Sequence, residues 1–171
     1  MMTRKEYKET VALECWGGGK ASLIQKIRFL YFTPNTNCAY LARKMWYLFE
    51  RGGLSRIRAK LIHLKILKKY GCVIFPYARV GAGFSVAHPV AIVLGNCTIG
   101  KNFTVYQGCT VGVKDDKQPP TIGDNVSLCA NSSIIGHIRI ADNVVIGAHS
   151  LVIKDIEESG VYAGSPVRKI K

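Results

Sequence analysis

The amino-acid sequence predicts a parallel β-helix of about four coils, preceded by a short α-helical region over residues 1–71. Three observations support this fold class. Aliphatic residues recur with a period of six between Ile74 and Val152, one polar insertion interrupts that period, and the residues before it have helical composition. The composition is 48% hydrophobic with 17 glycines, which supports a packed protein rather than a disordered chain.

The period-six repeat is the strongest of these signals. An aliphatic residue opens each hexad, and ten of the twelve steps between these markers are six residues long. The markers are Ile74, Val80, Val86, Val93, Ile99, Val105, Val111, Ile122, Leu128, Ile134, Ile140, Ile146 and Val152. Four residues later we expect a second inward side chain, at Phe84, Val90, Phe103, Cys109, Val126, Ser132, Ile138, Val144 and Ser150. Neither a helix nor a single strand repeats every six residues, whereas stacked coils that bury a common column do.

The insertion covers residues 112–121, with the sequence GVKDDKQPPT, where one step lengthens to eleven residues. It is polar and contains Pro119 and Pro120, so we expect it to leave the β-helix as a loop. Loops on a rigid scaffold often carry binding residues. Asp115 and Asp116 are therefore candidate substrate-binding residues.

The helical region carries most of the positive charge. Residues 1–70 contain 15 Lys and Arg against four Glu, a net charge of +11, whereas residues 71–171 contain nine against seven, a net charge of +2. Helical composition is seen in KASLIQKIRFLYF and NCAYLARKMWYLFER, which the TPN sequence at 33–35 separates. A third segment, LSRIRAKLIHLKILKKY, ends before Gly71 and spaces four aliphatic residues as in a helix: Leu54, Ile57, Leu61 and Leu64.

Two interpretations of the basic helices stay open. They pack on the β-helix and show a solvated basic face, or they lie on a membrane surface with Lys and Arg stems directed toward anionic lipid. No run approaches the roughly 18–20 apolar residues of a spanning helix, and residues 1–16 lack the apolar core of a secretory signal. We therefore expect a cytoplasmic protein, with peripheral membrane contact as the open alternative. The repeat has no basic stripe interleaved with aromatic residues, so we expect no nucleic-acid partner.

Two stretches resemble the hexapeptide-repeat acyltransferases, most closely their serine acetyltransferase-like branch. They are AHPVAIVLGNCTIGKNFTVYQGCTVG and the ending IGAHSLVIKDIEESGVYAGSPVRKI, and the resemblance covers about residues 72–171. It implies a left-handed β-helix over residues 72–157, an exception to the usual right-handed crossover, with residues 158–171 closing the cofactor site. It also implies a homotrimer that binds acetyl-coenzyme A (acetyl-CoA) as co-substrate in a cleft between coils.

His88 is the candidate catalytic residue. It stands two residues after the marker Val86, so we expect its side chain outside the packed column. In the family, a histidine in this context is the general base, and the resemblance implies that role for His88. An alcohol is a poor nucleophile at neutral pH, and an imidazole can take its proton during attack on the thioester. From the residues alone, a core histidine and an ordinary surface histidine stay as alternatives.

The remaining histidines and the cysteines argue against a metal site. His88 and His149 fall on one face but three coils apart, roughly 14 Å by strand spacing, and His137 falls on another face. We expect His63 to be an interfacial or surface residue. The cysteines form no C-x-x-C pair, and we expect them to be small apolar fillers: Cys15, Cys38, Cys72, Cys97, Cys109 and Cys129.

Six residues match the family's cofactor-binding positions: Gly112, Ala130, Gly147, Ala148, Lys154 and Arg168. The resemblance implies that the small residues border the pantetheine arm of acetyl-CoA. It implies that Lys154 and Arg168 meet the nucleotide phosphates, for which cationic side chains are suited. Ordinary solvated charges are the alternative for these two residues.

The sequence departs from true serine acetyltransferases in the residues expected to hold the amino acid. Those enzymes generally have an aspartate before the histidine, where Ala87 stands here, and another in the preceding coil, where Val73 stands. Their inserted loop carries an Arg-His pair where this chain reads KQPP at 117–120. A charged amino acid bound without partner charges would lose several kcal/mol, so a neutral hydroxyl acceptor is favoured.

The predicted function is therefore an acetyl-CoA-dependent O-acetyltransferase that acts on a hydroxyl of a saccharide or polysaccharide precursor. The alternative is a serine O-acetyltransferase of cysteine biosynthesis. A non-catalytic β-helix scaffold is a second alternative, which binding of coenzyme A (CoA) would separate from the other two.

Overall fold

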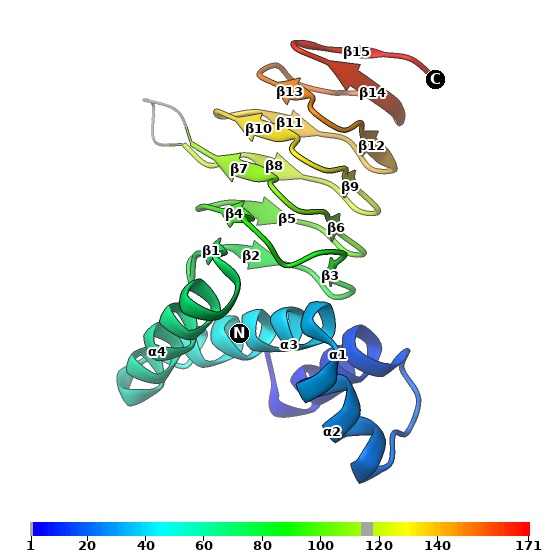
Figure 1. Cartoon of the computed structure of the whole chain (residues 1–171). Helices are drawn as coiled ribbons and strands as arrows, with labels where there is room; N and C mark the ends of the chain where they lie inside the picture. The colour runs from blue at the N-terminus through cyan, green and yellow to red at the C-terminus, as the bar shows by residue number, and fades with distance from the viewer. Residues whose placement is uncertain (1, 114–117) are drawn as a thin grey trace.

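Four helices form one end of the molecule, and a stack of short parallel strands forms the rest (Figure 1). The computed structural model describes residues 2–113 and 118–171. The chain rises from the helices through successive coils, so that the C-terminus lies at the far end from the helical region. The candidate residues Asp115 and Asp116 lie outside the described residues.

The helical region contains one more helix than the sequence predicts. The helices are α1 (Arg4–Trp16), α2 (Leu23–Phe32), α3 (Pro34–Glu50) and α4 (Gly53–Tyr70). α1 begins with a capping box in which Thr3 and Glu6 exchange side-chain-to-backbone hydrogen bonds. The T-x-x-E signature for this box was present in the sequence. α4 ends at Gly71, which adopts the left-handed conformation at φ 62°.

The strands form three sheets, which are the three faces of a β-helix. Face 1 contains β1 (Val73–Ile74), β4 (Val93–Leu94), β7 (Thr110–Gly112), β10 (Ser133–Ile135) and β13 (Leu151–Val152). Face 2 contains β2 (Arg79–Val80), β5 (Thr98–Ile99), β8 (Thr121–Ile122) and β11 (Arg139–Ile140). Face 3 contains β3 (Ser85–Val86), β6 (Thr104–Val105), β9 (Ser127–Leu128), β12 (Val144–Ile146), β14 (Gly160–Gly164) and β15 (Val167–Lys169). All pairs are parallel except β14 with β15.

The β-helix has five coils among the described residues, not the predicted four. The fifth is formed by β13, a bridge between Ile140 and Ile156, and β14. The hexad count missed it because Ile156 follows Val152 after four residues rather than six. β15 then turns back on β14 and covers the end of the stack.

One step of the repeat was assigned wrongly. Val93 is half-buried, and its neighbour Leu94 is the side chain that fills the core and pairs with Ile74. Val90 was expected to point inward but is 59% exposed, and Ile92 is buried in its place. The cause is a longer corner, in which Ala91 takes the left-handed conformation at φ 53°. This longer corner contains His88.

The aligned corners between face 2 and face 3 explain the Gly-x-Asn pattern of the repeat. The Asp124 carboxylate accepts the Lys101 backbone N–H of the coil below, at 2.6 Å. Asn102 and Asn125 join neighbouring coils through a side-chain hydrogen bond of 2.9 Å. A Cβ atom at Gly100 would collide with the Asp124 carboxylate, so this close stacking requires glycine there.

The helices cover the first coil, which has no coil beneath it. The Trp46 indole of α3 packs edge-on against Phe84 and donates to the Phe75 carbonyl at 3.0 Å. His63 of α4 is half-buried and its Nδ1 lies 2.8 Å from the Ile74 carbonyl oxygen. His63 is thus an interfacial residue, one of the two outcomes expected from the sequence.

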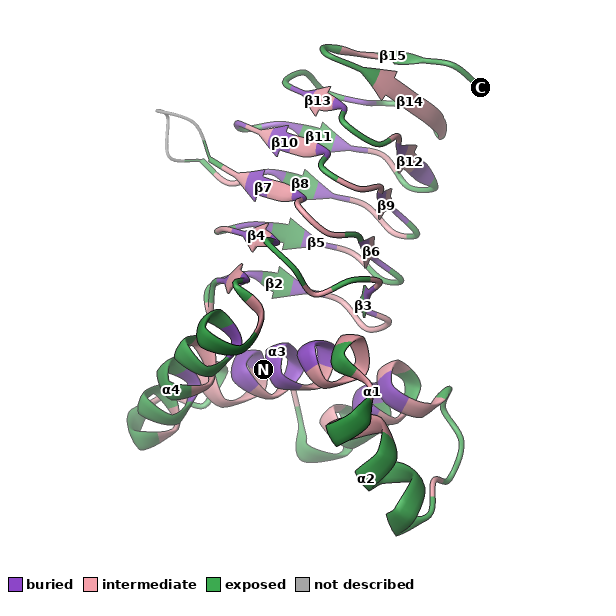
Figure 2. Ribbon diagram, viewed as in Figure 1, coloured by how far each residue is buried: buried purple, intermediate pink, exposed green. Residues whose placement is uncertain are grey.

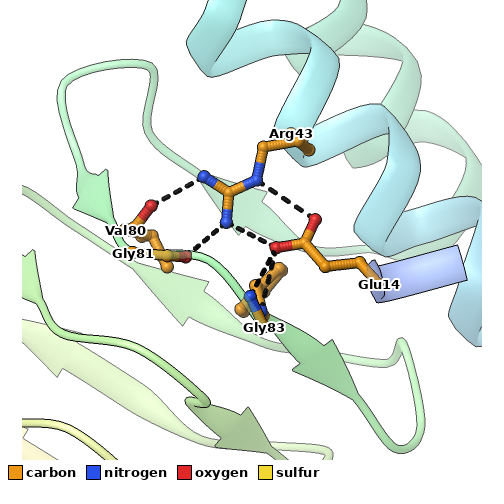
Figure 3. Close-up of polar contacts among 6 residues, drawn as sticks. Glu14, Arg43, Val80, Gly81 and Gly83 are labelled. Carbon is orange, nitrogen blue, oxygen red and sulfur yellow. Dashed lines mark hydrogen bonds and ion pairs between the residues drawn. The ribbon is translucent and has the colours of Figure 1, made fainter. Parts of the chain in front are cut away.

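A buried ion pair joins α1, α3 and the first coil (Figure 3). The Arg43 guanidinium is 2% exposed and contacts the Glu14 carboxylate at 2.6 Å. Arg43 also donates to the carbonyls of Val80 and Gly81, and Glu14 accepts the Gly83 backbone N–H at 3.1 Å. Burial raises the pKa of the Glu14 carboxyl, and the contact with Arg43 opposes that rise.

α4 packs on the rest of the protein through the face opposite its aliphatic stripe. Leu54, Ile57, Leu61 and Leu64 are 78%, 56%, 61% and 45% exposed, so the predicted stripe faces solvent. The buried side chains of α4 are Ala59 and Ile66 on the opposite face. In Figure 2 most of α4 is coloured as exposed, whereas much of α3 is coloured as buried. α4 therefore packs on α3 and the first coil, as one of the two interpretations expected, while its aliphatic stripe stays exposed.

The ion pair leads to a stability prediction. Arg43→Met should lower the free energy of unfolding by about 3–5 kcal/mol, because it leaves the Glu14 carboxylate buried without its partner. Urea unfolding at one protein concentration measures this change. Because the two groups are coupled, Glu14→Leu and Arg43→Met together should cost less than the sum of the single changes.

The neighbouring half-buried Lys44 provides the matched control, since Lys44→Met removes one cation from the same helix without breaking the pair. Equal losses from Arg43→Met and Lys44→Met would show that the ion pair does not stabilise the junction.

Candidate active site

His88 lies on an outer corner of the β-helix, between β3 and β4. Its side chain is exposed, while Val86 just before it is buried in the core. The His88 carbonyl accepts the Val90 backbone N–H at 2.9 Å, which closes a tight turn. The imidazole therefore lies outside the packed column.

A pocket of about 670 Å³ contains His88 at the junction between the β-helix and the helical region. One wall is the His88 corner, and the other is formed by the start of α3 and the end of α4. The lining residues are Pro34, Asn35, Lys69, Tyr70, Ala87, His88, Pro89 and Val90. Helices that cap the first coil thus also form half of the pocket.

The helical wall of the pocket is held by hydrogen bonds to Asn37. The Tyr70 hydroxyl donates to the Asn37 side-chain oxygen at 2.6 Å, and the Lys69 ammonium donates to the same atom at 3.1 Å. Burial raises the pKa of Tyr70 to about 12, so its hydroxyl remains a donor at neutral pH. Beneath this wall, a hydrogen bond from Cys38 lowers the pKa of Cys72 to about 7.

The nearest ring contact of His88 is with Tyr106, on the next coil. Their ring centroids lie 6.2 Å apart in an edge-to-face arrangement. Within residues 2–113 and 118–171, the His88 ring makes no hydrogen bond and no carboxylate lines its pocket. We expect the ring to be oriented by a backbone carbonyl or by Asp115 or Asp116 of the insertion; no such carbonyl bonds to it in this part of the chain, and the two acids lie outside the described residues.

Successive coils align their corners above His88, and we call this line of corners the His88 edge (residues 87–92, 106–109, 129–132 and 147–150). Backbone hydrogen bonds connect it: Gly108 N–H to the Val90 carbonyl at 3.0 Å, and His149 N–H to the Ala130 carbonyl at 2.9 Å. Three predicted cofactor residues lie on this edge: Ala130, Gly147 and Ala148. By strand spacing they are roughly 10–14 Å from His88 along the stack.

The other predicted cofactor residues lie elsewhere on the same chain. Gly112 ends β7 and Lys154 follows β13, so both lie at the opposite edge of face 1. Arg168 lies on β15 and pairs with Ala163 of β14. Lys154 and Arg168 are exposed. One chain therefore does not bring all six residues into one cleft.

Close packing requires glycine at only one of the two glycines predicted to bind the cofactor, Gly147 and Gly112. A Cβ atom at Gly147 would lie 2.9 Å from the Ala163 Cβ, so close packing of the last coils requires glycine there. A Cβ atom at Gly112 would meet Ile135 at 3.7 Å, an ordinary contact distance. Packing therefore explains Gly147 and leaves Gly112 open to another role.

Sequence reasoning missed two residues of the His88 edge, Tyr106 and Gln107. Tyr106 is the ring partner of His88. The side-chain oxygen of Gln107 is buried and has no hydrogen-bond partner among the described residues. Such an unpaired acceptor is costly in a fold unless a ligand or water satisfies it. The signal was the YQG sequence at the corner one coil after His88.

The remaining histidines are not gathered around His88. His149 is on the His88 edge beside Asn131, whose side-chain nitrogen lies 3.4 Å from its Nε2 atom, and His137 lies between β10 and β11. The described ranges contain no group of three His, Cys, Asp or Glu residues placed to hold a metal ion.

This chain is similar in sequence and in fold to bacterial hexapeptide transferases. Residues 119–154 match the family model for the bacterial transferase hexapeptide (six repeats). The matching relatives are serine acetyltransferases: that of Staphylococcus epidermidis is 40% identical over 105 residues, and that of Staphylococcus aureus 38%. Each match covers 59% of this chain and 49% of the relative, so the chain spans about half the length of the curated relatives it matches.

Solved structures extend the likeness to the helical region. Neisseria gonorrhoeae serine acetyltransferase has a TM-score of 0.82 and 27% identity, with 99% of this chain and 68% of that chain covered. The same enzyme in complex with serine gives 0.82 and 26%, over 98% and 70%. A serine acetyltransferase in complex with CoA, at 23% identity and a TM-score of 0.80, shares the fold. The left-handed β-helix and the resemblance to the serine acetyltransferase-like branch, both predicted from the sequence, are confirmed.

Proposed function

We propose that this protein is an O-acetyltransferase that transfers the acetyl group of acetyl-CoA directly to an alcohol hydroxyl, with His88 as the general base. The observation that carries the proposal is the position of His88. Its ring lies outside the core, in a pocket, at the base of an edge that also presents Ala130 and Gly147. The support from outside the chain is its similarity to serine acetyltransferases.

The proposed chemistry needs one base and no covalent enzyme intermediate. His88 removes the proton of the acceptor hydroxyl as the oxygen attacks the thioester carbonyl. The tetrahedral intermediate then collapses, the C–S bond breaks, and the thiolate of CoA leaves and receives a proton. Backbone N–H groups on the His88 edge are suited to stabilise the oxyanion, because they are already oriented by the coils.

The similarity to named relatives favours serine as the acceptor over the saccharide expected from the sequence. The matching relatives are serine acetyltransferases, and one neighbouring structure contains serine. In the pocket, Lys69 is suited to pair with the carboxylate of an amino acid. Serine O-acetylation is therefore the first candidate reaction.

A saccharide acceptor is the second candidate, and one observation favours it. None of the described residues that line the His88 pocket carries a carboxylate that could pair with the ammonium group of serine. The residue directly before the histidine is Ala87, which has no charge. A neutral hydroxyl compound requires no such partner. The two candidates share the base and the co-substrate and differ in what holds the acceptor.

An acceptor assay tests the function and separates the two candidates. We expect acetyl-CoA to be consumed in the presence of a hydroxyl acceptor. The release of the free thiol of CoA measures this consumption. Serine, threonine, and a panel of monosaccharides and oligosaccharides are compared at equal concentrations. Preference for serine supports the first candidate and turnover with sugars alone supports the second. Failure to bind CoA would overturn the transferase proposal and leave the scaffold alternative.

His88→Ala should slow acetyl transfer by about 10²–10⁴-fold, the usual contribution of a general base. The melting temperature and the affinity for CoA should stay close to those of the unchanged protein, because the ring is exposed and outside the packed column. His149→Ala is the matched control, since it removes an exposed imidazole three coils further along the same edge. Near-normal transfer by His88→Ala would exclude His88 as the base.

Lys154 and Arg168 are proposed to bind the nucleotide phosphates of acetyl-CoA. Changing both to Ala should weaken binding of CoA more than binding of 3′-dephospho-CoA, because the first ligand carries the additional phosphate. Isothermal titration with the two ligands measures the difference. Changing the exposed pair Lys101 and Arg139 to Ala is the control. If both ligands lose the same affinity, neither cation contacts the 3′-phosphate.

A homotrimer is proposed as the working assembly. Gly112 and Lys154 lie across face 1 from Ala130 and Gly147, so a cleft lined by all of these residues needs edges from two chains. Sedimentation equilibrium should give a mass of three chains or a multiple of three. A monomer that turns over acetyl-CoA would contradict both the assembly and the shared cleft.

A further inference from the structure

α4 has two apolar faces on opposite sides. The inner face packs against α3 and the first coil through Ala59, Ile62 and Ile66. The outer stripe consists of four residues that are between 45% and 78% exposed: Leu54, Ile57, Leu61 and Leu64. A helix that only covers a β-helix needs one apolar face. The outer stripe therefore has no partner within the described chain.

The outer stripe is bordered by cations. At 3.6 residues per turn, Arg58 and Lys65 lie along one side of the stripe and Lys60 along the other. All three are exposed. The sequence contains no Asp or Glu between Glu50 and Asp115, so α4 itself offers no acid to neutralise these charges.

α2, like α4, combines exposed apolar side chains with cations. None of its residues is buried, and it exposes five large apolar side chains: Leu23, Ile24, Ile27, Tyr31 and Phe32. Their exposed fractions run from 45% to 79%. Lys26 and Arg28 are its only charged residues. Both helices belong to the end of the molecule opposite the C-terminus, one on either side of α3 (Figure 1).

We propose that α2 and α4 hold this protein on an anionic membrane surface. Apolar side chains flanked by Lys and Arg match the boundary between acyl chains and negatively charged headgroups. A second copy docked face to face on these helices fits less well, because two such faces would bring cations together without any acid on either helix. No helix in the described ranges is long and apolar enough to cross a membrane, so the contact is peripheral.

The two components of this contact predict separate effects. Each cation near an anionic surface contributes about fivefold to partitioning, and this attraction weakens as salt screens it. Each inserted leucine contributes about tenfold or more, which depends little on salt. Membrane binding requires both the cations and the inserted apolar side chains, because the apolar stripe of each helix is short.

The test is co-sedimentation of the whole protein with vesicles. We expect binding to phosphatidylcholine vesicles that contain about one third phosphatidylglycerol, and little binding to phosphatidylcholine alone. Leu61→Ser with Leu64→Ser should lower the partition coefficient about 100-fold. Lys60→Gln with Lys65→Gln should lower it about 25-fold at low salt and much less at high salt.

Matched controls use exposed residues of the β-helix. Lys101→Gln with Arg139→Gln removes two cations, and Ile170→Ser removes an apolar side chain that is 65% exposed. Both controls should bind vesicles like the unchanged protein. Melting temperature and CoA binding are measured on every variant, so that failure of the membrane proposal is distinguished from failure of the proposed activity.

Three outcomes would overturn the proposal. Equal binding to neutral and anionic vesicles would show that the exposed faces of α2 and α4 do not recognise an anionic surface. An equal loss of vesicle binding in the control variants would show the same. If Leu61→Ser with Leu64→Ser leaves vesicle binding unchanged but reduces the assembled mass in sedimentation equilibrium, a second copy of the chain covers the stripe.

Discussion

The first coil of the β-helix imposes the constraint on which the rest of the structure depends. Every later coil receives backbone hydrogen bonds from the coil beneath it, but the first has only its own helical region there. Side chains of the helices take that role: Arg43 donates to two carbonyls, Glu14 accepts two backbone N–H groups, and Trp46 donates to the Phe75 carbonyl. An open sheet edge would otherwise pair with another chain.

This closure also builds the candidate site. To satisfy the first coil, α3 and α4 must lie across its base, and their ends then reach the corner that carries His88. The lengthened corner between β3 and β4 moves Val90 out of the core, and the exposed imidazole lies on this corner. The pocket therefore results from the junction of two structural regions, and neither region contains it alone. The outer face of α4 is left free because the inner face already makes the packing contacts.

The similarity to serine acetyltransferases supports the fold of this chain more strongly than it supports any particular acceptor. A β-helix with the same coil geometry can support different acceptors, because the acceptor is recognised by a few side chains at the corners. Here Ala87 precedes His88, and the matching relatives are serine acetyltransferases. Within this chain, the coils align His88, Ala130 and Gly147 along one edge.

The sequence by itself determined the β-helix, its insertion and the outward position of His88, because all three follow from a short local period. It also indicated three of the four described helices at nearly correct bounds, including the end of α4 before Gly71. It assigned Val93 for Leu94 because the long corner at 87–92 breaks the period, and it missed the fifth coil because Ile156 follows Val152 after only four residues. The order of residues could not show that Arg43 meets Glu14, or that Ala59 and Ile66 rather than Leu61 pack inward. Those outcomes depend on contacts between segments far apart in the chain, and only the tertiary structure decides which of two apolar faces is buried.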